Sequence, residues 1–175
     1  PLSLLPTIRS RISRLSLRPL ANNDLDRLVS NYLPELTPTD RAALIAISDG
    51  SIGRALALGT QGGLELDREV SGLLEALPKT DAERLHRFAD TLARPGQEAA
   101  WRTATALLSW RLSRAIEAAA HGKSTELAPL VRRLDRAVEV WDKVRDLVAQ
   151  SDGTSHARKQ VVLGAFFALE RAARG

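Results

Sequence analysis

The sequence predicts a mainly α-helical protein with one short strand near its N-terminus. Apolar residues recur three and four positions apart through most of the chain, which is the period of a helix with one buried face. Residues that start helices alternate with glycines and prolines that end them. Hydrophobic residues make up 44% of the 175 positions and aromatic residues only 4%, and such an aliphatic composition suits helices. We therefore expect a short strand, three short helices and then a bundle of longer helices.

The N-terminal stretch Leu4–Leu20 is basic and contains no acidic residue. The chain has 25 Lys and Arg residues against 21 Asp and Glu residues, so the arginines of this stretch equal the whole formal excess of +4. These arginines are Arg9, Arg11, Arg14 and Arg18. Pro6 is suited to begin a helical turn, and polar and apolar residues alternate from Ser13 to Pro19, which predicts a strand. We expect a rigid turn that carries Arg9 and Arg11; the alternative is a solvated edge strand whose charges prevent aggregation.

Three short helices are expected between residues 21 and 61. Asn22 or Asn23 can cap the first, and Ser51 can cap the third, Ile52–Leu58. The second has a proline at its start and is ended by glycine, over residues 38–50. The apolar face of the first helix would be Leu25, Leu28, Val29 and Tyr32 or Leu33.

Longer helical patterns follow a glycine-rich linker at residues 59–63. We expect helices over about 64–77, 81–94, 97–120, 127–148 and 156–173. In the 127–148 segment the apolar residues step by three and four without interruption, and Glu139 and Lys143 can pair at i, i+4. These segments predict an antiparallel helical bundle, because the uninterrupted seam is too short for a long coiled coil.

The 97–120 helix is apolar on two sides. Trp101, Leu108 and Leu112 form one stripe, and Leu107 and Trp110 lie off it. Because a helix must bury each apolar face, we expect Leu107 and Trp110 to contact another helix or a neighbouring subunit. Trp101 lies on a core stripe, as does Trp141 on the next helix, so packing explains these two better than stacking on nucleic-acid bases.

Several function classes find no support in the sequence. There is no Cys, and the three histidines, His86, His121 and His156, lie 35 residues apart and share no ligand spacing. We therefore expect no metal site. No apolar run approaches the ~18 residues of a membrane span, and the chain opens with no signal-peptide pattern, so a cytoplasmic location is expected. The chain has no Met and opens inside a motif, which indicates a piece of a longer protein.

The tetrapeptide Gly122-Lys123-Ser124-Thr125 imitates the end of a phosphate-binding P-loop. The motif needs a glycine where this chain has Glu117, and it needs a strand where this chain predicts a helix. Gly122 is better explained as a helix end, with Ser124 or Thr125 capping the next helix.

The basic stretch resembles the end of the nucleotide-binding core in AAA+ clamp-loader subunits. Their Ser-Arg-Cys motif is matched by Ser10-Arg11-Ile12, in which Ile12 replaces the Cys. The resemblance implies that Arg11 is an arginine finger that reaches the ATP site of a neighbouring subunit, where a fixed cationic fork stabilises the transferring phosphate. It also implies three parts: the end of the core at 1–20, a helical lid at 21–61 and a collar bundle at 62–175.

The segment Asp49–Leu56 resembles the sensor 2 region of the same family. The ATP-hydrolysing subunits carry the sensor arginine where this chain has Gly53, and Arg54 stands one position later. One residue turns a helical side chain by about 100°, so Arg54 is expected to be a vestigial sensor on the surface of a short helix. This departure favours the non-hydrolysing type of subunit.

The resemblance implies a function in loading the sliding clamp onto primed DNA during replication. Arg11 would act in trans on ATP held by neighbours, with no cofactor in this chain, which is not catalytic alone but belongs to a DNA polymerase holoenzyme, a nucleotidyltransferase. Expected partners are the γ/τ and δ subunits, and the clamp and DNA through the complex, without a membrane. Two alternatives stay open: an ATP-hydrolysing γ/τ motor subunit, or a helical interaction module with no nucleotide role.

Overall fold

The computed structural model describes residues 18–150 and 155–174, and it is mainly helical. Within these residues 77% of the fold is helix, in nine helices and with no strand. The Arg11 turn falls outside the described residues, as does the expected strand up to residue 17. The helices are α2 (Asn22–Tyr32), α3 (Pro38–Ser48), α4 (Ile52–Thr60), α5 (Gly63–Glu75), α6 (Ala82–Ala93), α7 (Glu98–Ala120), α8 (Ala128–Val131), α9 (Leu134–Ala149) and α10 (Ser155–Arg174).

Three of the described helix starts are capped by a side chain. The side chains of Thr37 and Ser51 accept hydrogen bonds from the backbone N–H of Asp40 (3.1 Å) and Arg54 (3.3 Å), at the starts of α3 and α4. Asp81 does the same for α6, accepting from Glu83 N–H at 2.9 Å. The cap expected from Asn22 or Asn23 is not formed, because the N-cap of α2 is Ala21, which offers no side-chain acceptor.

Helices α2, α3 and α4 form a small three-helix layer with its own apolar cluster. Its buried residues are Leu25, Val29, Leu33, Leu44, Ile45, Ile47, Ala55, Leu58, Leu64 and Leu107. Tyr32, one of the two expected candidates for the apolar face of α2, is 64% exposed, and Leu33 takes the buried position. Leu33 lies just past the end of the helix, so the chain turns it inward after the helical period has ended.

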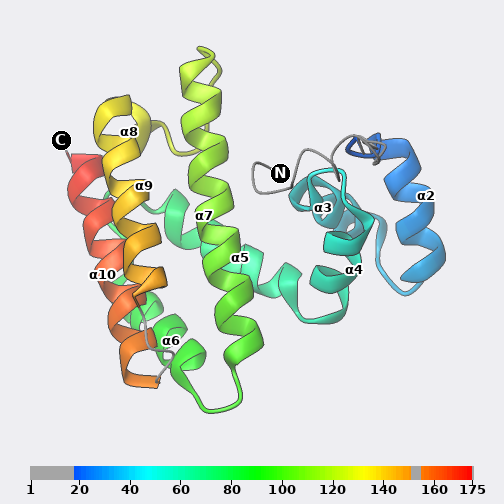
Figure 1. The fold of residues 1–175 in the computed structure, drawn as a ribbon, viewed down its shortest axis with the longest axis horizontal. Coiled ribbons are helices and arrows are strands. Elements are labelled where there is room, and N and C mark those ends of the chain that lie inside the picture. The colour runs from blue at the N-terminus through cyan, green and yellow to red at the C-terminus, as the bar shows by residue number, and fades with distance from the viewer. Residues whose placement is uncertain (1–17, 151–154, 175) are drawn as a thin grey trace, which may run out of the picture.

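Helices α5 to α10 form the bundle, which lies beside this layer (Figure 1). Helix α10 packs against α6, α8 and α9, and α7 packs against α5 and α9. Trp101 is buried in the bundle core, which confirms its predicted place. Trp141 is half-buried against the same core, and its indole N–H donates to the carbonyl oxygen of Ser109 at 3.3 Å.

The prediction of a single helix over residues 127–148 is wrong. The chain forms the short α8, leaves the helical path at Arg133, and begins α9 at Leu134. Leu134 is 37% exposed although the repeat predicted it buried, and Val140 is buried in its place. The reason is tertiary: α8 and α9 each pack against both α7 and α10, and the extended backbone of Arg133 (φ −121°, ψ 97°) redirects the chain between the two contacts.

The glycine-rich segment at 59–63 is a tight corner and not a loose linker. Helix α4 runs through Gly59 to Thr60, and α5 begins at Gly63, so only Gln61 and Gly62 lie between the helices. Gly63 is buried, and a Cβ there would lie 2.7 Å from the carbonyl oxygen of Leu58 and 2.8 Å from its Cα. A backbone contact of this kind fixes the direction in which α5 leaves the layer.

Gly63→Ala should therefore destabilise the protein, by about 1–3 kcal/mol as overpacked sites do. Gly164→Ala is the matched control, because a Cβ there would meet only the side chain of Leu147 at 3.8 Å, an ordinary contact. In the middle of α10 it should stabilise by about 0.5–1 kcal/mol. Urea unfolding followed by circular dichroism measures both changes, and equal effects of the two substitutions would contradict the tight corner.

Candidate functional site

The two site residues expected from the sequence have different outcomes. Arg11 lies outside the described residues. Arg54 stands in the first turn of α4, and its guanidinium carbon lies 5.3 Å from the centroid of the Trp110 indole on α7. A cation at this distance from a ring face is attracted by the ring quadrupole. Arg54 is thus half-buried at a contact between α4 and α7, and not a simple surface residue.

The chain itself buries Leu107 and partly buries Trp110. Leu107 is 1% exposed and belongs to the apolar cluster of α2–α4, and Trp110 packs against the same cluster. The expectation of a contact with another helix is confirmed. The indole N–H of Trp110 is buried without an acceptor among the described residues. The ring therefore stabilises the contact through its buried apolar area and through the face that Arg54 approaches.

A buried ion pair lies next to this contact. Arg111 Nε and Nη2 donate to Asp67 Oδ1 and Oδ2 of α5, at 2.8 Å and 2.6 Å. The Asp67 side chain is only 9% exposed, so the pair is bidentate and largely dry. Arg68, the next residue of α5, pairs with Asp40 of α3. The two arginines therefore connect α5 to α7 on one side and to the three-helix layer on the other.

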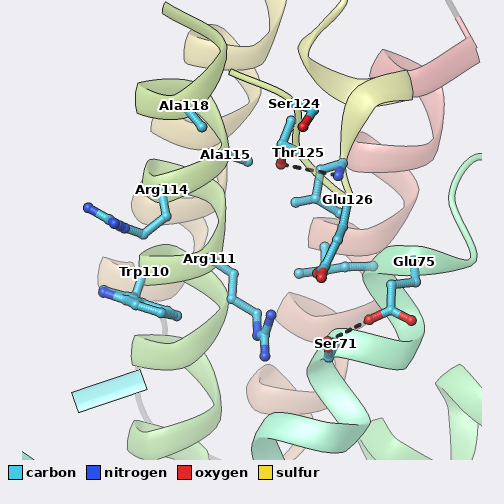
Figure 2. A pocket seen from close by; sticks show the side chains of 12 residues that line it. Ser71, Glu75, Trp110, Arg111, Arg114, Ala115, Ala118, Ser124, Thr125 and Glu126 are labelled. Carbon is cyan, nitrogen blue, oxygen red and sulfur yellow. Dashed lines mark hydrogen bonds between the residues drawn. The ribbon is translucent and has the colours of Figure 1, made fainter. Parts of the chain in front are cut away.

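A pocket of about 330 Å³ opens beside the ion pair, between α5, α7 and the 121–127 loop (Figure 2). Arg111 points from α7 toward α5, while Glu75 and Glu126 lie on the opposite side. Glu75 accepts a hydrogen bond from Ser71 Oγ at 2.8 Å. Ala115, Ala118, Leu74 and Leu127 supply its apolar lining.

The cations of this pocket are already paired. Arg111 is held by Asp67, and Arg114 Nη1 lies 3.0 Å from Glu117. Ser124 and Thr125 also line the pocket, but the preceding element is helix α7, which ends before Gly122 at a φ of +67°. Thr125 Oγ1 accepts from Leu127 N–H at 3.3 Å. The expected helix end at Gly122 is confirmed, and a phosphate cradle is absent from this part of the structure.

The described residues include no group of three or more His, Asp or Glu side chains that could hold a metal ion. Two carboxyl groups have lowered pKa values, and both stand at helix starts. The pKa of Glu98 is lowered by its own backbone N–H and then by Arg158, and that of Asp135 by the N–H of Arg136 and then by Arg133. Helix geometry explains these shifts without a reaction.

Among the described helices, none is long and apolar enough to cross a membrane. Comparisons of the chain with known protein families, curated proteins and solved structures found no match.

Sequence reasoning missed the Asp67–Arg111 pair. A signal was present, because Asp67 stands three residues from both Leu64 and Val70 and therefore falls on the buried stripe of α5. An acidic residue on such a stripe requires a cation from another element. Which cation pairs with Asp67 depends on how α5 and α7 pack together, and the local sequence pattern does not record this packing.

Asp67→Ala should be strongly destabilising, because it leaves the half-buried Arg111 unpaired; breaking a buried pair costs about 3–5 kcal/mol. Adding Arg111→Met should recover a large part of the loss, since the isolated cation is then gone. The control is Glu83→Ala, which breaks an exposed pair with Arg87 on α6 and should change stability by about 0–1 kcal/mol. Denaturant unfolding of all variants tests this, and a double variant no better than Asp67→Ala would contradict it.

Trp110→Ala should loosen the three-helix layer more than the bundle. Removing a partly buried tryptophan should cost about 2–3 kcal/mol, at or below the low end for fully buried rings. Native-state hydrogen exchange should show faster exchange for amides of α2–α4, with smaller changes in α6 and α10. Arg54→Ala is the control, since it removes only the ring contact, at about 0.5–1 kcal/mol. A uniform change across all helices would contradict this division.

Proposed function

We propose that this chain is the C-terminal part of a δ′-type subunit of the bacterial DNA polymerase III clamp loader. It would assist the ATP-dependent loading of the sliding clamp onto primed DNA without hydrolysing ATP itself. The observation that carries the proposal is the acid-free Leu4–Leu20 stretch with Ser10-Arg11-Ile12, together with the one-residue displacement of Arg54. In this proposal Arg11 is the residue that acts on a neighbouring ATP site.

The order of the described elements supports the proposal. Three short helices, α2–α4, precede a bundle of longer helices, α5–α10, which is the expected order of a lid and a collar. The strand expected to close the nucleotide-binding core lies outside the described residues. The division at 1–20, 21–61 and 62–175 stays a prediction.

The position of Arg54 supports the non-hydrolysing assignment over a γ/τ motor subunit. Its guanidinium is engaged with the Trp110 ring at 5.3 Å, and the Ser51 cap holds the helix turn that carries it. To reach a phosphate, the Arg54 side chain would have to leave the Trp110 ring, and it would lose the cation–π attraction and the apolar contact that the ring provides. We infer that Arg54 joins α4 to α7 and does not sense ATP.

The packed corner and the buried contacts of α7 suit a subunit that moves as one body. Gly63 fixes the exit of α5, and the Asp67–Arg111 pair fixes α5 against α7. A rigid scaffold is what an arginine finger requires, because its effect depends on holding a charged fork at one place near the transferring phosphate. The δ and γ/τ subunits would be its neighbours.

The second candidate function is a helical interaction module without a nucleotide role. It is favoured by one observation: a groove between α9 and α10 is lined by cations that have no partner among the described residues. This candidate assigns no role to Arg11.

Arg11→Ala should separate these functions in a clamp loader reconstituted with the full-length protein. Loss of an arginine finger can lower hydrolysis at one site by about 10³-fold or more, and the total ATPase activity would fall less because other sites remain. Clamp loading should fall while assembly, measured by size-exclusion chromatography, stays intact. Arg54→Ala is the control and should leave ATP turnover within about a few-fold of wild type. Normal clamp loading by Arg11→Ala would refute the finger.

A further inference from the structure

Helices α9 and α10 enclose a second groove, of about 240 Å³, that the proposed function does not use. Its apolar lining consists of Val140 from α9 and of Ala168 and Ala172 from α10. Three cations, Arg136, Lys143 and Arg171, and one carboxylate, Glu139, line the same groove. Three positive charges against one negative give it a local charge of +2.

The three cations have no partner among the described residues. Arg136, Lys143 and Arg171 take part in no side-chain hydrogen bond or ion pair there, and the Glu139–Lys143 pair expected from the i, i+4 spacing is not formed. Two other arginines at α9 are paired, Arg133 with Asp135 and Arg145 with Asp142, both at 3.1 Å. The three groove cations are therefore free to pair with an incoming anion.

An exposed aromatic residue lies one helical turn from Arg171, at the edge of the groove. Phe167 is 56% exposed, the most exposed large hydrophobic side chain of the bundle. It lies four residues before Arg171 on α10, so the two share one face of the helix. An exposed ring next to unpaired cations is a combination suited to an amphipathic partner.

The spacing of the cations fits the repeat of a helix. Arg136 and Lys143 are seven residues apart on α9, which places them about 10 Å apart along the axis. Acidic residues at i and i+7 of a second helix lying along the groove have the same separation. Apolar residues at i+3 and i+4 of that helix would then lie between them, over the apolar lining.

We propose that the α9–α10 groove binds an acidic amphipathic helix of a partner protein. Glutamates or aspartates of that helix pair with Arg136, Lys143 and Arg171, and its apolar side chains cover Val140, Ala168 and Phe167. Arginine forms bidentate pairs with carboxylates, and an apolar lining between the cations adds contact area. This binding does not depend on the clamp-loader assignment.

Nucleic acid fits the groove less well. On the exposed outer face of α9, Asp135 and Asp142 are paired with Arg133 and Arg145, and Asp146 adds a further negative charge. This face therefore offers little net positive charge to a phosphate backbone that extends beyond the groove. The three groove cations are also few beside the about 6–10 phosphate contacts of a protein that binds DNA strongly. A short carboxylate-bearing segment places its charges only where the groove is positive.

The test uses the full 175-residue chain, labelled with ¹⁵N, and a synthetic helical probe. The probe has glutamates at i and i+7 and leucines at i+3 and i+4, and at about 14 residues it is roughly 21 Å long. A second peptide carries glutamine in place of each glutamate, and a short DNA duplex is the third ligand. The acidic peptide should shift the amide resonances of residues 136–143 and 164–172, and the glutamine peptide should bind about tenfold or more weakly.

Two triple variants with equal charge change separate the groove from general attraction. Arg136→Glu, Lys143→Glu and Arg171→Glu together reverse the groove. Lys79→Glu, Arg102→Glu and Lys123→Glu together reverse three exposed cations elsewhere. The first triple should weaken binding about tenfold or more and the second by less than about threefold. Phe167→Ser should also weaken binding without changing the net charge.

Circular dichroism confirms folding of each variant. The proposal is overturned if the acidic peptide leaves the groove resonances unshifted at millimolar concentration. It is equally overturned if both triples weaken binding alike, if the glutamine peptide binds as well as the acidic one, or if the duplex binds this groove more tightly than the peptide.

Discussion

Helix α7 must bury two apolar faces, and the rest of the structure depends on this requirement. One face, with Trp101, Leu108 and Leu112, fills the bundle core, and the other, with Leu107 and Trp110, covers the cluster of α2–α4. A helix with one apolar stripe would leave the three-helix layer attached only through α5. Because α7 closes both clusters, neither part can move away without exposing apolar area to water.

The polar contacts around α7 give this packing its direction. The Asp67–Arg111 pair contributes little net stability by itself, since desolvation offsets its attraction, but a misaligned α5 would leave a buried charge unpaired. The Arg54–Trp110 contact and the backbone approach at Gly63 restrict the same junction from the other side. A junction specified in this way suits a rigid subunit that presents one arginine to a neighbour, as the proposed function requires. It leaves the α9–α10 groove free for a separate partner.

The charge of the chain is distributed in two distinct ways. The formal excess of +4 equals the four arginines before residue 21, and the rest of the chain is balanced at 21 positive and 21 negative residues. Even so, the α9–α10 groove is locally positive, because Asp135 and Asp142 of α9 pair with Arg133 and Arg145 and not with Arg136 or Lys143. The net charge of a segment therefore says nothing of where a groove is positive; the choice of ion-pair partners decides that.

The sequence by itself determined the helical class, most helix limits and the two apolar faces of α7, because caps, stops and the helical period act over a few residues. It also placed Asp67 on a buried stripe. Only the tertiary structure decided that Arg111 pairs with Asp67, that Trp110 faces α4, and that the helix over residues 127–148 is interrupted at Arg133. The reason is physical: each of these depends on which distant element supplies the opposing surface, and a local pattern records that a face must be buried but not what buries it.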